Sequence, residues 1–246
     1  MSRLLRANFS RLFKSKILYL CICVQGIITF FAVFPYRADF SVEKIISENA
    51  LSSMLFSAVF VPLFLGTEYS DKTIRNKIIS GHTRVEIYSA NLISAVTGTA
   101  MICLAPLVTA LIMALTFNGH PGNSPAELTL HFIVLTAANA AMCGIYLISA
   151  MLVTSKANNV VATLAIWFGS GFITAFIDEL LKMPQLSDGV LKKFLRYAYD
   201  ITPVGQALQI QIGECQNAKI FPVYSLLVIA AATGLGILIF KRKDLN

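Results

Sequence analysis

Residues 67–88 read TEYSDKTIRNKIISGHTRVEIY and form a polar, basic segment between two apolar stretches of the chain. The segment decides the fold, because it divides the apolar sequence into membrane-length pieces and carries charge that helps to orient them. Ser70 or Asp71 is a suitable N-cap for a helix that runs to about Ser80, and Gly81 supplies a terminating turn. We therefore expect a short helix outside the bilayer, between two membrane-spanning helices.

One side of this expected helix is apolar, because Ile74, Ile78 and, more loosely, Tyr69 fall on a common stripe. Basic side chains flank the stripe at Lys72, Arg75 and Lys77. A helix of two turns is marginal by itself in water, so it needs a surface to lie against. That surface is either the bilayer or a groove of a partner protein, and the sequence leaves both open.

The composition is that of a membrane protein. Apolar residues make up 56% of the 246 residues and charged residues 13%, whereas soluble domains carry about 25% charged residues. The net charge of +7 fits loops that face an anionic inner leaflet better than it fits a nucleic-acid surface. We therefore expect contact with membrane lipid and none with nucleic acid.

Six segments are long and apolar enough, or nearly so, to cross a bilayer, which requires about 20 residues of low charge. They are residues 17–34, 51–66, 88–117, 128–153, 159–177 and 220–240. Pro106 lies near the middle of the third segment, where a proline removes a helix hydrogen bond and bends the helix. The sequence predicts an all-α membrane protein with six transmembrane helices in a single domain, residues 1–246.

Lysine and arginine place both termini on the cytoplasmic side. With the N-terminus inside, the pieces assigned to the cytoplasm hold thirteen of the 20 basic residues, in agreement with the positive-inside rule. The polar segment at residues 67–87 is then cytoplasmic, and residues 178–219 are extracytoplasmic. Residues 17–34 are a long apolar run with no small-residue cleavage site after it, so we expect a retained first span rather than a signal peptide.

The start of the chain has amphipathic character. In residues 1–16, Leu5, Phe9, Leu12 and Phe13 recur at helical spacing among basic residues, which predicts an interfacial elbow helix. Plain positive flanking of the first span explains the same charges, and the two interpretations are compatible.

The segment before the last span is too apolar for a solvated linker. Residues 178–219 contain two candidate short helices around a turn at Pro203. We expect an extracytoplasmic helical cap that packs against the outer ends of the spans. The sequence leaves open whether this cap re-enters the bilayer.

Small residues recur inside the spans, as at Ala140 and Gly144 in the fourth and at Gly169 and Gly171 in the fifth. Such residues let helix backbones approach each other closely. The close approach is either packing within this chain, which we favour, or a contact between subunits.

The span interiors carry no Asp, Glu, Lys or Arg, although ion-driven transporters usually place such groups within the membrane. The three histidines and five cysteines show no spacing typical of a metal site or of a nucleophile with its base. We therefore expect no catalytic, cofactor-binding or metal-binding residues in this chain, and no enzyme activity. If the protein moves a solute uphill, the energy must enter from outside the spans.

The polar segment also follows a wider pattern: a small residue ends the second span, then come Glu-Tyr, Thr-Ile, a basic stretch, and Gly-x-x-Arg before the third span. The pattern consists of Gly66, Glu68, Tyr69, Thr73, Ile74, Arg75, Asn76, Lys77, Gly81, Arg84 and Tyr88. It resembles the permease subunit of the type 2 ABC exporter family, except that Lys72-Thr73 replaces the Gly-Thr of many relatives. The opening RANFSRLFKSKILY, the six spans, the long outer loop and the closing FKRKDLN are similar to the same family, in particular to its bacitracin- and lantibiotic-immunity-type permeases.

The resemblance implies a multi-pass transport subunit in the bacterial cytoplasmic (inner) membrane. It would pair with a second copy or a sister permease and with two cytoplasmic ABC ATPase subunits. ATP and Mg²⁺ would bind to those ATPases, because this chain has no G-x-x-x-x-G-K-[ST] phosphate loop. Residues 67–87 would act as the coupling segment. The residues expected to contact the ATPase are Glu68, Tyr69, Lys72, Thr73, Ile74, Arg75, Asn76, Lys77, Ile78, Gly81 and Arg84.

The apolar spans favour a hydrophobic or amphipathic substrate, and a peptide antibiotic is the leading candidate, with antibiotic resistance as the consequence of its export. Two other classes of function stay open. One is a non-transporting membrane anchor or sensor that recruits a cytosolic partner through the same helix. The other is a passive channel or a membrane enzyme.

Overall fold

The structure, a computed structural model, is almost entirely helical. It describes residues 1–36, 39–70, 73–117, 119–153, 155–183, 189–213 and 218–242, with the backbone alone for residues 69–70. The helices are α1 (Ser2–Phe13), α2 (Lys16–Val33), α3 (Val42–Glu48), α4 (Ala50–Ser70), α5 (Thr73–Ile79), α6 (Arg84–Thr116), α7 (Pro125–Leu152), α8 (Lys156–Lys182), α9 (Val190–Ile201), α10 (Pro203–Ile212) and α11 (Phe221–Arg242). The short elements are the 3-10 turns η1 (Phe34–Tyr36) and η2 (Ala218–Ile220), and the parallel pair β1 (Phe40–Ser41) and β2 (Gly119–His120).

Six helices in the described residues are long and apolar enough to cross a membrane, so the predicted number of spans is confirmed. They are α2, α4, α6, α7, α8 and α11. The helices extend beyond the predicted spans on both sides of the polar segment, because α4 continues to Ser70 and α6 already begins at Arg84. Glu68, which the sequence assigned to the connecting segment, therefore lies in the last turn of a long helix.

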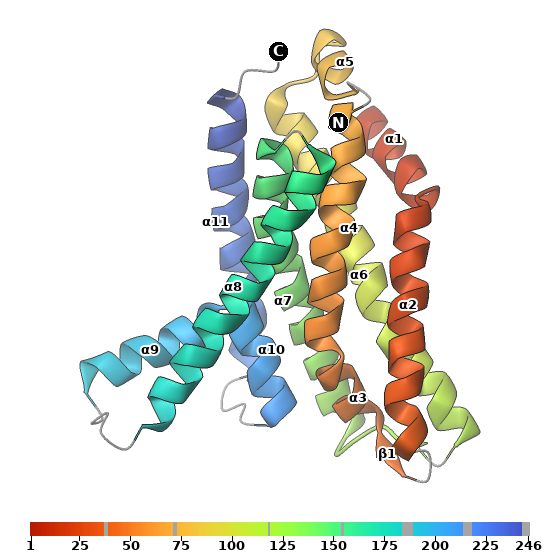
Figure 1. The fold of residues 1–246 in the computed structure, drawn as a ribbon, viewed down its shortest axis with the longest axis vertical. Helices are drawn as coiled ribbons and strands as arrows, with labels where there is room; N and C mark the ends of the chain where they lie inside the picture. Colours follow the sequence, from red (N-terminus) through yellow and green to blue (C-terminus); the bar gives the residue numbers. More distant parts are fainter. Residues whose placement is uncertain are drawn as a thin grey trace.

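The long helices lie side by side, and the short elements gather at the two ends of the bundle (Figure 1). The start of α1, the end of α11 and the whole of α5 lie at one end, which we call the terminal end. The opposite end, the far end, holds α3, β1, α9 and α10. The first and last described helices and α5 therefore share one end of the bundle, and the side of the membrane that this end faces stays a prediction.

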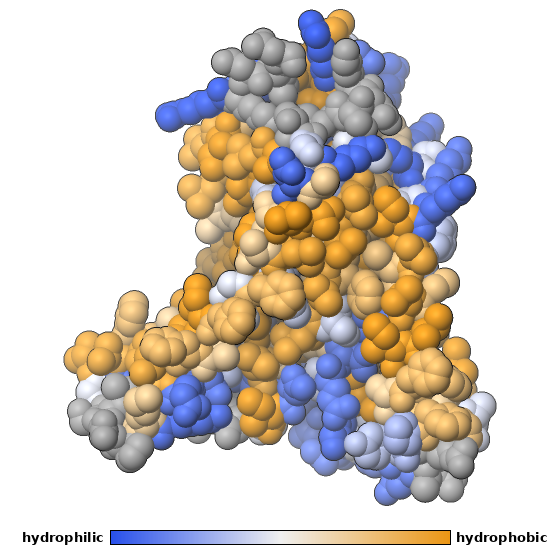
Figure 2. Space-filling model, viewed as in Figure 1, coloured by the Kyte–Doolittle hydropathy of each residue, from blue (hydrophilic) through white to orange (hydrophobic). Residues whose placement is uncertain are grey.

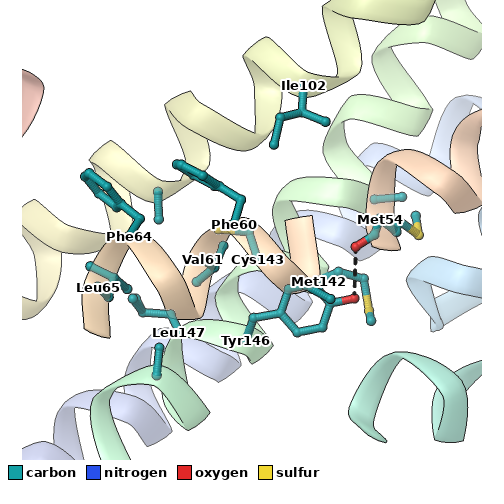
Figure 3. Close-up of a cluster of buried hydrophobic side chains, with 14 of the residues drawn as sticks. Met54, Phe60, Val61, Phe64, Leu65, Ile102, Met142, Cys143, Tyr146 and Leu147 are labelled. Carbon is teal, nitrogen blue, oxygen red and sulfur yellow. Dashed lines mark hydrogen bonds between the residues drawn. The ribbon is translucent and has the colours of Figure 1, made fainter. Parts of the chain in front are cut away.

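The core lies where α4, α6 and α7 meet (Figure 3). On α4, Phe60 and Phe64 are buried and stack with their ring centroids 5.3 Å apart. The Tyr146 hydroxyl of α7 donates a hydrogen bond of 3.4 Å to the Met54 carbonyl oxygen of α4. A Cβ at Gly98 of α6 would overlap the Phe60 ring, so the glycine permits this close approach of the two helices.

α1 does not lie free on a membrane surface. Leu4, Asn8 and Leu12 are buried, and the helix packs against α6. The predicted apolar stripe is divided, because Leu12 is buried whereas Phe13 is 52% exposed. The predicted helix in residues 1–16 is present, but the chain itself covers one side of it, and only part of the stripe is exposed.

The cap predicted for residues 178–219 is less compact than expected. Residues 178–182 continue α8, which ends at Lys182. α10 packs back into the bundle with most of its residues buried. α9 instead projects sideways from the bundle (Figure 1). Of the two short helices, α10 is therefore the one that covers the ends of the spans.

The small residues of the spans occupy two different environments. A Cβ added to Gly144 of α7 would lie 3.6 Å from Ala232 of α11, so packing within the chain accounts for this glycine. Around Gly169 and Gly171 of α8, an added Cβ would meet no described atom within 4 Å. α8 is also the least buried of the six spans. In its most apolar stretch of 18 residues 11% are buried, whereas in the corresponding stretch of α4 61% are buried. Packing within the described part of the chain therefore does not explain the glycines of α8.

Candidate functional site

The polar segment folds into α5 and a tight turn that leads into α6. α5 ends in a Schellman motif, in which the Gly81 N–H donates to the Ile78 carbonyl oxygen at 2.9 Å. The second bond of the motif runs from the His82 N–H to the Lys77 carbonyl oxygen at 3.2 Å. Gly81 has a φ of 86°, which costs residues with a side chain about 1–2 kcal/mol. The predicted terminating turn at Gly81 is confirmed.

The start of α5 differs from prediction. Ser70, one of the two expected N-caps, is the last residue of α4. Asp71, the other one, lies outside the described residues. The polar segment is therefore divided between the end of one helix and a separate, shorter helix.

α5 lies with its apolar side against the chain's own bundle. Ile74 is 2% exposed, and Ile78 packs against the same buried cluster. The two isoleucines do share one face, but the surface that covers it is neither the bilayer nor a partner. The Tyr69 side chain, the third member of the predicted stripe, lies outside the described residues. A partner would have to contact the opposite side of α5.

Glu68 is the centre of the site. Its side chain is completely buried, and its Oε1 lies 2.6 Å from Arg11 Nη1 and 2.5 Å from Lys77 Nζ. Arg11 belongs to α1 and Lys77 to α5. The Glu68 carboxylate of α4 therefore links α1, α4 and α5 through ion pairs. The Arg11 guanidinium also lies over the Phe64 ring, 4.3 Å from its centroid, in a cation–π geometry.

Two buried asparagines extend these contacts to α6. The Asn91 side-chain amide donates to Glu68 Oε2 at 2.8 Å, and Asn91 Oδ1 accepts a hydrogen bond of 2.7 Å from the Asn8 amide. Lys77 Nζ also donates to Asn8 Oδ1 at 3.1 Å. We call Asn8, Arg11, Glu68, Lys77 and Asn91 the Glu68 network. It joins α1, α4, α5 and α6 at the terminal end.

The charges of the Glu68 network do not balance, because two cations face one carboxylate. Burial of the ammonium group lowers the pKa of Lys77 in spite of its attraction to Glu68. A buried ion pair of this kind contributes little net stability, whereas loss of one partner leaves an uncompensated charge and costs about 3–5 kcal/mol. The network therefore acts more to fix the position of α5 than to stabilise the whole fold.

Arg84 fastens the start of α6 to the end of α11. Its Nη1 donates to the carbonyl oxygens of Phe240 and Lys241 at 2.8 and 2.9 Å. These carbonyls belong to the last turn of α11, where acceptors lack partners within the helix and a cation is favoured. One turn further along α6, Tyr88 packs so closely on Gly236 that a Cβ there would overlap the phenol. The two helices are thus joined by both polar and packing contacts.

The side of α5 that faces away from the bundle lies at the extreme of the terminal end (Figure 1). Arg75, Asn76 and Ser80 are exposed, and Ile79 has 75% of its surface exposed. We call these four residues the α5 tip. It combines a cation, an amide and an apolar side chain on an element that projects beyond the spans, so it is accessible to a protein in solution.

The structure divides the predicted contact residues into groups. Those buried in the chain or bonded to other parts of it are Glu68, Thr73, Ile74, Lys77, Ile78 and Arg84. The exposed ones are Arg75, Asn76 and Gly81. Lys72 and the Tyr69 side chain lie outside the described residues. Most of the described members therefore position α5, and few of them are free to touch a partner.

Sequence reasoning missed Asn8, Arg11 and Asn91 of the Glu68 network. Asn8 stands between Leu4 and Leu12 on the buried face of α1, and a polar residue at such a position indicates a buried hydrogen bond. That signal could have found Asn8. Arg11 is one of several basic residues before the first span, and nothing in the sequence distinguishes it from ordinary flanking charge.

Comparisons with known protein families and with curated protein sequences give no match for this chain. The fold itself defines a class: a multi-pass helical membrane protein with six spans. In this fold, a buried carboxylate holds a short helix at the terminal end of the bundle.

Proposed function

We propose that this chain is the permease subunit of an ATP-driven exporter and that the α5 tip contacts a separate cytoplasmic ATPase. The observation that supports this most is the Glu68 network. A buried carboxylate with two cations is costly to assemble, and here it holds a two-turn helix that would be unstable by itself. The chain thereby maintains a projecting polar helix outside its spans, as docking onto a soluble partner requires.

The same contacts provide a physical route for coupling. A displacement of the α5 tip would pass through Lys77 and Glu68 into α4, and through the bond from Lys77 to Asn8 into α1. Arg84, at the start of the next helix, would carry it to α11. Because packed helices shift between discrete arrangements as units rather than deform continuously, a movement at the tip would move whole spans.

The energy for transport would come from ATP and Mg²⁺ bound to the partner, since the six predicted span interiors contain no ionisable Asp, Glu, Lys or Arg. Two ATPases and a second permease copy, or a sister permease, would complete the assembly in the bacterial cytoplasmic membrane. The apolar spans favour a hydrophobic or amphipathic substrate such as a peptide antibiotic. A membrane anchor or sensor would use the same tip without transport, and the experiments below separate the two.

Docking is tested by co-purification from native membranes with variants of the α5 tip. Arg75→Glu and Ile79→Asp alter exposed side chains, so the fold should be preserved. We expect the pair to weaken recovery of an ATPase at least about tenfold, since central interface residues contribute more than about 1 kcal/mol each. The control is Arg6→Glu, which reverses an exposed charge on α1 at the same end. Undiminished ATPase recovery with the double variant, or no ATPase with the parent chain, would refute the docking role.

Glu68→Gln separates transport from anchoring, because it leaves the exposed residues of the α5 tip unchanged while loosening their support. A permease should then keep part of its bound ATPase, whereas ATP-dependent efflux of an amphipathic peptide should fall more steeply. An anchor or sensor would show no efflux in the parent chain either. Equal losses of docking and efflux would show that the network does not transmit motion.

A further inference from the structure

α9 forms an arm that leaves the helical bundle at the far end. It runs more across than along the direction of the spans and extends to the left of the lower part of α8 (Figure 1). Tyr199, at 4% exposure, is the one buried residue among those described in α9. The helix contacts α8, α10 and α11. Most of its side chains therefore do not belong to the core of this chain.

The exposed side chains of α9 are of two kinds, apolar and basic. The apolar arc consists of Val190, Leu191, Phe194, Tyr197 and Ile201, whose surfaces are 86%, 60%, 66%, 60% and 43% exposed. At 3.6 residues per turn these positions fall along one side of the helix. Lys193 lies beside this arc and Arg196 further around the helix, and both are exposed. Asp200, between them, is partly buried and accepts a hydrogen bond from the Gln209 side chain. An apolar arc of this size would be unfavourable in water, so something must cover it.

We propose that α9 lies in the interface of the membrane leaflet at the far end, with its apolar arc among the acyl chains and Lys193 and Arg196 on the phosphates of anionic lipids. An amphipathic helix with basic residues beside an apolar face is suited to this position. The surface of α9 is also continuous with that of α8, whose Phe172 and Phe176 are 76% and 65% exposed. Figure 2 shows this hydrophobic surface running from the spans onto the arm.

The charges of α9 favour lipid over a second copy of the chain as the occupant. Interfaces between proteins are depleted in lysine, and their buried centres are depleted in charge. Lys193 and Arg196 border the apolar arc closely enough to reach headgroups while their stems stay on apolar surface, as long basic side chains do at membrane interfaces. The inference depends on the membrane-spanning fold and on α9, and it does not depend on the proposed exporter function.

The depth of α9 is tested with tryptophan fluorescence in bilayers whose lipids carry bromine on the acyl chains. Trp167 is the single tryptophan, so Trp167→Phe gives a silent background, and the parent chain supplies the correction if that variant is unstable. We expect strong quenching for Phe194→Trp and weak quenching for Arg196→Trp, because the two positions lie on nearly opposite sides of the helix, about 160° apart. Equal, weak quenching at both positions would overturn the proposal, as would protection of Phe194→Trp that appears with dimer formation.

The choice of lipid is tested by measuring how much phosphatidylglycerol stays bound to the chain purified from mixed phosphatidylglycerol–phosphatidylcholine vesicles. Each basic residue near an anionic surface contributes enough to change binding about fivefold. Lys193→Gln and Arg196→Gln should each lower retention of phosphatidylglycerol by about that factor and leave phosphatidylcholine unchanged. The matched control is Lys44→Gln, a 72% exposed lysine at the same end but outside α9. Equal effects of all three substitutions, or none, would contradict a headgroup site on α9.

Discussion

Replacing Glu68 by glutamine removes one negative charge and almost preserves the side-chain volume. Arg11 and Lys77 would then face each other without a counter-charge, at side-chain exposures of 31% and 15% beside the fully buried Glu68. Breaking a buried pair costs about 3–5 kcal/mol. Because Arg11 is almost one third exposed and partly screened by water, we expect the lower end of that range, about 3 kcal/mol.

This cost should fall mainly on the attachment of α5, whose other buried contacts come from Ile74 and Ile78. Hydrogen exchange of the hydrogen-bonded backbone amides at the end of α5, such as those of Ser80, Gly81 and His82, measures how often the helix detaches. A loss of about 3 kcal/mol corresponds to roughly 100-fold faster exchange. Amides of the buried middle of α7 should change much less, because the packing around Tyr146 does not involve the Glu68 network.

Two further variants make the result specific. Glu179→Gln makes the same chemical change at an exposed position of α8 and should leave exchange in α5 unaltered. Adding Lys77→Met to Glu68→Gln removes one of the two stranded cations, so it should restore part of the protection. If exchange in α5 were the same in Glu68→Gln as in the parent chain, other contacts would hold α5, and the account of the network would be wrong.

Four other features can be tested by single substitutions. Gly81→Ala should lower stability by about 1–2 kcal/mol, because alanine is strained at positive φ, and thermal unfolding in detergent measures it. Gly169→Ala should raise stability in the same assay by about 0.5–1 kcal/mol, because alanine favours the helix and the site is open; a decrease would indicate that another chain packs there. Tyr88→Phe should be neutral or slightly stabilising, because the buried hydroxyl has no hydrogen-bond partner among the described residues, and a loss above about 1 kcal/mol would contradict this. Arg84→Met should cost about 1.5–3 kcal/mol locally and speed hydrogen exchange in the last turn of α11, while unchanged exchange there would show that Arg84 does not cap that helix.

The outcome for the α5 segment shows where prediction from sequence was sound and where it failed. The turn at Gly81 was predicted correctly, since a glycine after a helical pattern marks a left-handed residue through local sterics alone. The apolar stripe of Ile74 and Ile78 was also correct as a pattern. Its environment was not, because periodicity shows that a face will be covered and does not identify what covers it.

The sequence by itself determined the number of spans, the helical class and the grouping of both termini with the polar segment. Hydrophobic length and loop charge are properties of each segment separately, so they can be read without knowing which segments meet. The tertiary structure alone decided that Glu68 meets Arg11, Lys77 and Asn91, and that α9 stands away from the bundle. Those facts depend on contacts between residues far apart in the chain, such as Asn8 and Asn91, which are separated by 83 positions. The partners of a buried charge cannot be read from the sequence, because its need for them arises only when packing removes the water that would otherwise solvate it.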